Sequence, residues 1–232
     1  MLKLSKRLQA IANLVPNNSI AADIGTDHGF IPGYLIENNV CKRVIGTDIS
    51  KGSLDKIIEF VKENEFSDRI SCRLGDGLEP VKEFEADTVI IAGMGGLLIK
   101  DILEKDKHIA NSITNFIFQP MIAAKELRKY LLNNSFQILK ENLIKEDNKY
   151  YEIIFAKKGK DSFEKEIYFE ISPLLIKEKH PLLKEFLEFK INSANNILVD
   201  LEGIDTDKSQ ERYNELTMRI KEYKEVLGSL ES

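Results

Sequence analysis

Two aspartates around one glycine-rich turn are the first residues that could do chemistry. In ADIGTDHG, residues 22–29, Asp23 follows a short apolar run and Asp27 lies in the turn after it. Gly25 and Gly29 would let a ligand come close to the backbone there. Carboxylates beside bare backbone can hold polar groups of a ligand, or stabilise a positive charge that develops on it. The alternative interpretation is a plain turn built of small residues.

A third carboxylate, Asp48, follows Gly25 by 23 residues in the sequence GTDIS. An acidic residue about 20 residues beyond a glycine-rich strand–helix turn can accept hydrogen bonds from both hydroxyls of a ribose. The competing interpretation is helix capping, which Ser50 could equally supply. The spacing favours ribose binding.

Two further glycine-rich stretches follow the same pattern. GDG at 75–77 can present a carboxylate or a backbone N–H to an adenine edge, although Asp-Gly is also a common turn sequence. AGMGG at 92–96 has three glycines in four positions, which leaves bare backbone where a flat substrate could lie. Together with the two earlier stretches, these sequences predict a site for a nucleoside-containing cofactor.

The chemistry of that cofactor is limited by what the glycine motifs lack. The sequence has no Walker A motif, which argues against a nucleoside triphosphate, and no complete GxGxxG, which weakens an NAD-linked oxidoreductase. A cofactor with an adenosine but no phosphate fits better. S-adenosylmethionine is the obvious candidate.

Strands that alternate with helices must position these stretches. The pattern predicts an α/β fold with a mostly parallel sheet, closed by an antiparallel hairpin of residues 136–147 and 149–158. An amphipathic helix is expected over residues 1–16. The other expected strands are 19–25, 43–50, 69–77, 86–96 and 114–120, and the other expected helices are 30–39 (beginning near Pro32), 53–64, 97–106 and 123–134.

The pattern changes after residue 160. Apolar residues at 187, 191, 194, 198 and 201, and again from 213 to 230, repeat every three and four positions. The short loop EGIDTD separates the two runs, so we expect an antiparallel coiled-coil hairpin. Two ordinary amphipathic helices packed on the main domain are the alternative. The predicted domains are residues 1–160 and 161–232.

The bulk composition restricts the setting and the partners. The net charge of −5 argues mildly against nucleic acid as a partner, although local lysine clusters such as Lys177, Lys179 and Lys184 matter more than totals. Cys41 and Cys72 form no metal-binding spacing, so no metal is expected. The two cysteines without CxxC or metal spacing favour a reducing, cytoplasmic setting, and the sequence has no secretory signal and no apolar run near the ~18 residues of a membrane span, so no membrane contact is expected.

Five stretches carry a resemblance to a known family. The chain resembles the bacterial tRNA (adenine-22-N1)-methyltransferases over essentially its whole length. The resemblance implies a Rossmann-like class I methyltransferase domain with a coiled-coil appendage, S-adenosylmethionine as methyl donor and tRNA as acceptor. It rests on KLSKRL at 3–8, ADIGTDHGFIP at 22–32, GDGL at 75–78, IAGMGG at 91–96 and QP at 119–120.

Site roles follow from the motifs and the resemblance together. Asp27 is the expected catalytic residue, because methylation of adenine N1 makes the ring cationic and a nearby carboxylate would stabilise it. His28 is either a hydrogen-bonded loop residue or a ligand contact. The predicted cofactor-binding residues are Asp23, Gly25, Thr26, His28, Gly29, Asp48, Ile49, Asp76, Gly77, Ala92 and Gly93, and the predicted acceptor-binding residues are Met94, Gly95, Gln119, Pro120, Lys177, Lys179 and Lys184.

Two other functions stay open at the level of the sequence. A small-molecule methyltransferase could use the same donor site. A non-catalytic protein could bind the cofactor as a sensor and use the helical hairpin to contact other proteins. No obligate protein partner is expected for the enzyme.

Overall fold

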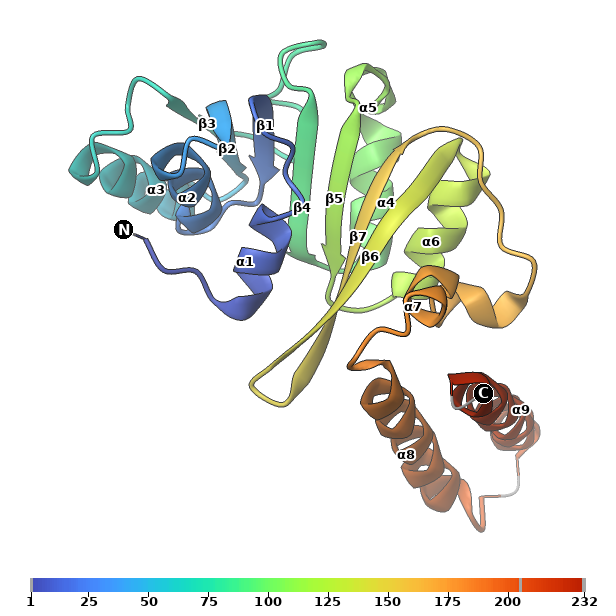
Figure 1. The fold of residues 1–232 in the computed structure, drawn as a ribbon. Helices are drawn as coiled ribbons and strands as arrows, with labels where there is room; N and C mark the ends of the chain where they lie inside the picture. Colours follow the sequence, from blue (N-terminus) through green and yellow to red (C-terminus); the bar gives the residue numbers. More distant parts are fainter. Residues whose placement is uncertain (1, 205, 231–232) are drawn as a thin grey trace. The chain divides into compact units, whose positions relative to one another are not determined.

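The computed structural model describes residues 2–204 and 206–230 of the 232-residue chain. The chain divides into two compact units, Met1–Ser162 and Phe163–Ser232 (Figure 1). The first unit contains one seven-stranded sheet with helices on both faces, and the second is helical.

The sheet has the strand order β3-β2-β1-β4-β5-β7-β6. The first five strands pair in parallel, and β7 and β6 add an antiparallel hairpin at one edge, as the sequence predicted. The order reverses between β1 and β4, and ligands of such sheets bind at the strand ends beside this reversal. The bounds are β1 Ser19–Ile24, β2 Cys41–Asp48, β3 Ile70–Leu74, β4 Thr88–Met94, β5 Asn115–Pro120, β6 Phe136–Glu146 and β7 Lys149–Lys158.

Helices cover both faces of the sheet because its central strands are apolar on both sides. All six residues of β5 are buried, as expected of a strand between two helical layers. One core cluster joins β1, β2 and β4 to α1 Lys6–Ala12, α2 Phe30–Glu37 and α3 Lys51–Glu63. On the other face lie α4 Gly96–Lys105, α5 Lys107–Ser112 and α6 Ala124–Asn133, of which α4 packs against β4, β5 and α6 (Figure 1).

The helix boundaries differ from the prediction at several places. The helix expected over residues 1–16 covers only α1, which begins after its N-cap Ser5. α2 begins at Phe30, before Pro32, because Gly29 takes a left-handed φ of 73° and ends the preceding turn. Three short helices were not predicted, since four to six residues are too few to show helical periodicity. They are α5, the 3₁₀ helix η1 Glu166–Phe169 and α7 Pro173–Lys177.

The C-terminal unit is built on two long helices, α8 Leu183–Leu201 and α9 Asp207–Leu230, which pack against each other. Their contact buries Leu187 and Ile191 of α8 and Leu216 and Ile220 of α9, four residues of the predicted apolar runs. Tyr213, in the same run, is 40% exposed, so the seam is not continuous. Supercoiling of the pair stays a prediction.

A buried polar contact fixes the far end of α9 within this unit. Glu170, just after η1, accepts a hydrogen bond from the Tyr223 hydroxyl, and its other oxygen lies 3.1 Å from Arg219 Nε. Glu170 and Tyr223 are both buried. A buried carboxylate is tolerated here because a charged partner and a hydrogen bond compensate for its lost hydration.

Among the described residues, none of the helices combines the length and the apolar character needed to cross a lipid bilayer.

Candidate active site

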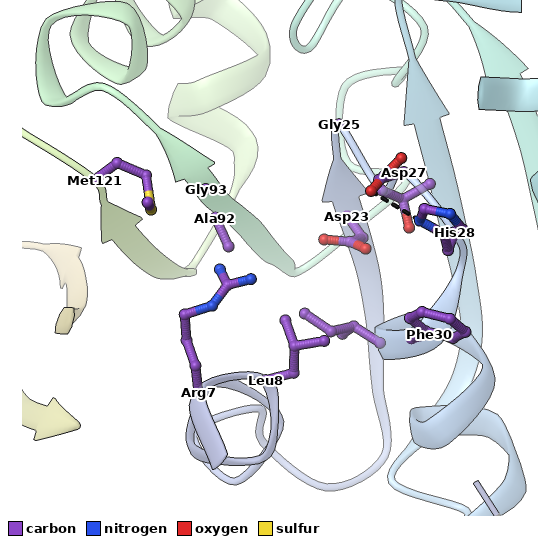
Figure 2. A pocket seen from close by; sticks show the side chains of 12 residues that line it. Arg7, Leu8, Asp23, Gly25, Asp27, His28, Phe30, Ala92, Gly93 and Met121 are labelled. Atoms are coloured by element: carbon purple, nitrogen blue, oxygen red, sulfur yellow. Dashed lines mark ion pairs between the residues drawn. The ribbon is translucent and has the colours of Figure 1, made fainter. Parts of the chain in front are cut away.

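A cavity of about 440 Å³ opens at the carboxyl ends of β1 and β4, beside the reversal of strand order (Figure 2). It brings together seven of the residues that the sequence predicted for the site, and five that it did not. The predicted ones are Asp23, Gly25, Thr26, Asp27, His28, Ala92 and Gly93; the additional ones are Arg7, Leu8, Phe30, Ile31 and Met121.

The β1–α2 turn is shaped by left-handed backbone at three alternate positions. Gly25, Asp27 and Gly29 have φ of 71°, 51° and 73°. The backbone N–H groups of Gly25 and Thr26 both donate to the carbonyl of Thr47, at 2.8 and 3.0 Å, which ties the turn to β2. A Cβ at Gly25 would also collide with Met94 Cε. The left-handed φ favours glycine at this position, whereas the flexible end of the Met94 side chain can shift to make room.

Asp23 is a buried carboxyl group at the cavity wall. It is 4% exposed, and burial raises its pKa to about 6, while the Thr26 hydroxyl partly offsets that rise. A cationic ligand group next to Asp23 would favour the carboxylate form again. The position is thus suited to bind an ammonium group.

Asp27 and His28 form a pair at the mouth of the cavity. His28 Nδ1 lies 2.8 Å from Asp27 Oδ2, and the side chains are 48% and 69% exposed respectively. The His28 ring stacks on Phe30, with centroids 5.4 Å apart and planes at 7°. Phe30 in turn meets the Phe60 ring edge-on. The aromatic contacts hold His28, and His28 orients the Asp27 carboxylate (Figure 2).

Asp48 lies at the end of β2, outside the residues that line this cavity. Its Oδ1 accepts a 2.7 Å hydrogen bond from the Ser50 N–H, and Ser50 itself caps α3. The capping role that competed with ribose binding thus belongs to Ser50. Within the described part of the chain, Asp48 Oδ2 has no hydrogen-bond partner. Ile49 beside it is 69% exposed.

The GDG stretch lies next to Asp48, since the Gly75 N–H donates to the Asp48 carbonyl at 3.0 Å. Asp76 is exposed and forms an ion pair with Lys105 at 2.8 Å. Gly77 has a φ of 65°, and a Cβ there would lie 3.0 Å from Ile102. These residues extend the polar edge from the cavity towards β3.

The three glycines at and just beyond the end of β4 serve different purposes. Gly93 is exposed, has a φ of 77° and faces open space: the nearest atom to a Cβ there would be Arg7 Nη1, 3.9 Å away. Gly95 is the N-cap of α4. Gly96 is buried, and a Cβ there would collide with the carbonyl of Ala123. Only Gly93 leaves bare backbone in the cavity, so the sequence interpretation of all three glycines as substrate space was too broad.

Arg7 is the main residue that sequence reasoning missed. Its Nη1 donates to Gln119 Oε1 at 2.6 Å. Gln119 is fully buried, and its Nε2 donates to the Pro120 carbonyl at 3.0 Å, so both ends of this amide are bound within the protein. Arg7 belongs to KLSKRL, a stretch that carries the family resemblance. That motif was the signal that could have found it.

The predicted lysine cluster lies in the C-terminal unit. Lys177 ends α7, Lys179 has a φ of 46°, and Lys184 is in the first turn of α8. All three side chains are exposed. Within the described residues, no group of three His, Cys, Asp or Glu side chains is arranged to hold a metal ion.

A parallel sheet whose strand order reverses between β1 and β4, with glycine-rich strand ends and a carboxylate-lined cavity beside the reversal, defines a Rossmann-like protein with a ligand site at the strand ends. A ribosomal protein L11 methylase from Lactobacillus delbrueckii shares this fold, with a TM-score of 0.53 at 20% identity over 66% of this chain and 80% of that chain. The family model for tRNA (adenine(22)-N(1))-methyltransferase matches residues 21–225. The chain belongs to this family.

Relatives of the same family match almost end to end. The tRNA (adenine(22)-N(1))-methyltransferase of Bacillus subtilis is 34% identical over 97% of this chain and 98% of its own. The crystal structure of the B. subtilis m1A22 tRNA methyltransferase TrmK has a TM-score of 0.88 at 33% identity, covering 98% and 100% of the two chains. M. capricolum TrmK in complex with S-adenosyl-homocysteine has a TM-score of 0.84 at 31% identity, covering 98% and 99%.

Proposed function

We propose that this protein transfers the methyl group of S-adenosylmethionine to N1 of adenosine 22 in tRNA. The observation that carries the proposal is the cavity at the ends of β1 and β4, where Asp23, Asp27 and Gly93 meet in a chain of this family. S-adenosylmethionine supplies an electrophilic methyl group on a sulfonium. The protein must bind and orient the two reactants and stabilise the charge that moves onto the adenine ring.

The residues along the strand ends suit the parts of this donor. Asp48 at the end of β2 uses Oδ1 to accept from Ser50, and its Oδ2, which has no partner among residues 2–204 and 206–230, suits the ribose hydroxyls. Asp23 at the end of β1 is a desolvated carboxyl group, suited to the ammonium of the donor's amino-acid end. Gly25 and Gly93 keep the backbone bare between them. The other predicted cofactor residues, such as Asp76 and Gly77, lie along the same edge of the sheet, at the ends of the strands.

Asp27 is the proposed catalytic residue. Adenine N1 carries an in-plane lone pair and no proton, so it attacks without a general base. Its ring becomes cationic, and the Asp27 carboxylate at the mouth of the cavity stabilises that charge. The carboxylate also accepts from the exocyclic amine, which orients the ring, and His28 holds the carboxylate in place at 2.8 Å.

Access to the acceptor requires that the adenosine leave the base stack. N1 of a stacked, paired adenine is out of reach, so the nucleotide is flipped into the cavity. Met94 and Gly95 border the acceptor side. Gln119 and Pro120 support that side from within the sheet, since the Gln119 amide is bound on both ends by the protein.

We assign tRNA docking to the C-terminal unit, predicted as domain 161–232, through its exposed Lys177, Lys179 and Lys184. Replacing all three by Gln in the full chain is expected to weaken tRNA binding and reduce its salt dependence, because each phosphate contact releases counterions. Unchanged tRNA affinity and salt slope in a folded triple variant would remove these lysines from the interface. Two expectations stay predictions: that the protein needs no obligate protein partner, and that it is cytoplasmic.

The test of the function is nucleoside mass spectrometry on tRNA incubated with the protein and S-adenosylmethionine. We expect 1-methyladenosine at position 22, and none in a transcript that carries guanosine there. A protein that methylates only a metabolite would support the small-molecule alternative instead. A protein that binds the donor but methylates nothing would support the sensor alternative.

Asp27→Asn tests the catalytic assignment without disturbing the turn, because Asn tolerates the left-handed φ of 51°. Removal of one group that stabilises transition-state charge costs about 10²-fold in turnover. Binding of S-adenosyl-homocysteine should change little. Asp101→Asn, an exposed carboxylate on α4, is the matched control. Turnover by Asp27→Asn equal to that of the control would exclude the catalytic role.

A further inference from the structure

Arg7 brings a positive charge into the cavity, and no described carboxylate forms an ion pair with it. α1 directs its guanidinium towards Ala92 and Gly93, across the cavity from Asp23 at the β1 end (Figure 2). Within the described residues, the guanidinium donates one hydrogen bond, from Nη1 to Gln119, and its Nε–H and Nη2–H groups have no acceptor. A half-buried guanidinium with most of its donors unused is arranged for a ligand.

The guanidinium is also held in one orientation. The 2.6 Å bond to Gln119 fixes Nη1, and the Tyr151 ring lies beneath the guanidinium with its centroid 5.3 Å from Cζ. The Gln119 amide is itself oriented by the Pro120 carbonyl, which accepts from Nε2 at 3.0 Å. Side-chain entropy is therefore lost on folding and not on ligand binding, which raises affinity.

The charge of Arg7 selects an anion and argues against the acceptor ring as its partner. A guanidinium beside an adenine that becomes cationic would oppose methyl transfer. Its unused N–H groups instead match two oxygens of a carboxylate or phosphate. We propose that Arg7 is the oxyanion-binding residue of the site, and that Gln119 is the positioning residue that holds it.

The inference rests on the proposed function, which brings two oxyanions to this cavity. One is the carboxylate of the donor's amino-acid end, whose ammonium would lie at Asp23 in the same cavity. The other is a backbone phosphate of the acceptor nucleotide. Both present paired oxygens, so binding measurements must separate them.

The experiment compares Arg7→Gln with Lys6→Gln, which removes the same charge from an exposed neighbour on the same helix. Calorimetry measures the affinity for S-adenosyl-homocysteine and for its analogue without the carboxylate, and filter binding measures the affinity for unmodified tRNA. Loss of a charged hydrogen bond costs about 10- to 100-fold in affinity. Arg7→Lys keeps the positive charge but removes the paired N–H groups of the guanidinium. We expect its ligand affinity to lie between those of the wild type and Arg7→Gln.

Two results support the inference and identify the anion. If it is the donor carboxylate, Arg7→Gln weakens S-adenosyl-homocysteine at least 10-fold and leaves the decarboxylated analogue unaffected. If the anion is a phosphate of the tRNA, the affinity of Arg7→Gln for tRNA falls by a similar factor. S-adenosyl-homocysteine and its analogue without the carboxylate then bind as before. Affinities of Arg7→Gln and Arg7→Lys equal to those of Lys6→Gln for all three ligands would overturn the inference.

Gln119→Leu tests the positioning role with the same ligands. It should weaken the ligand that Arg7→Gln weakens, and add nothing in the double variant, because both changes disable the same guanidinium. Full additivity would assign Gln119 an independent structural role. None of these measurements needs turnover. A wild-type protein that binds these ligands but methylates no tRNA would therefore refute the proposed function and leave the Arg7 comparison valid.

Discussion

Replacing Asp23 by Asn should make the unliganded protein more stable and the cofactor site weaker. The Asp23 side chain is almost fully buried, and its pKa is about 6 in the folded protein against 3.8 for the unperturbed group. The shift disfavours the charged form, so stability from this group is complete below pH ~4 and is lost as the pH rises through 6. An isosteric neutral side chain avoids that loss.

The size of the effect follows from the shift. About 2 pKa units at 1.36 kcal/mol each give an upper bound of about 3 kcal/mol at pH 8. At pH 4 most of the Asp23 side chains are protonated in the folded protein, and the gain falls to about 0.5 kcal/mol by the same linkage relation. The magnitude at pH 8 will be smaller where water reaches the carboxylate through the open cavity.

The assay is urea unfolding of wild type and Asp23→Asn at pH 4 and pH 8, with S-adenosyl-homocysteine calorimetry at pH 8. We expect a higher midpoint for the variant at pH 8, nearly equal midpoints at pH 4, and weaker ligand binding by the variant. A variant that is less stable than wild type at pH 8, or equally shifted at both pH values, would refute the assignment of Asp23 as a strained, functional carboxyl group.

Two substitutions test the packing that supports the site. Gly96→Ala should destabilise the protein by about 1–3 kcal/mol in urea unfolding, because its methyl group collides with the Ala123 carbonyl; an unchanged midpoint would contradict the close approach of these segments. Arg128→Ala should cost about 3–5 kcal/mol, because it leaves the buried carboxylate of Glu141 and the partly buried one of Glu152, each 2.5 Å from Arg128 Nη2, without their counter-charge; a loss below 1 kcal/mol would show that water or rearrangement compensates.

The sheet could be predicted from the sequence because its evidence is local. The first four strands are runs that end at or just before glycine or aspartate, and most of the intervening helices show their own periodicity, so the parallel direction of these strands follows from general rules. The reversal between β1 and β4 brought Asp23 and Asp27 to Gly93, as their positions at strand ends required.

The parts that escaped prediction depend on contacts between distant segments. Arg7 reaches the cavity only because α1 packs on the β6–β7 hairpin, where Tyr151 lies beneath its guanidinium. Gln119 stays a predicted acceptor-side residue, but its pairing with Arg7, 112 residues away, has no signal in the local sequence. Gly96 resembled substrate space in sequence, but Ala123, 27 residues further on, explains it. No local pattern encodes such pairs.

The left-handed backbone at Asp27 also limits how this turn can evolve. Replacement by a residue other than Gly or Asn costs about 1–2 kcal/mol of folding free energy at a φ of 51°, whatever happens to catalysis. Most single-nucleotide changes of an aspartate codon, such as those to Val, Tyr or Glu, therefore carry two penalties at once. Selection for a folded protein alone would restrict this position to aspartate, asparagine and glycine, so a preference for aspartate over the other two reports on its carboxylate and not on the backbone.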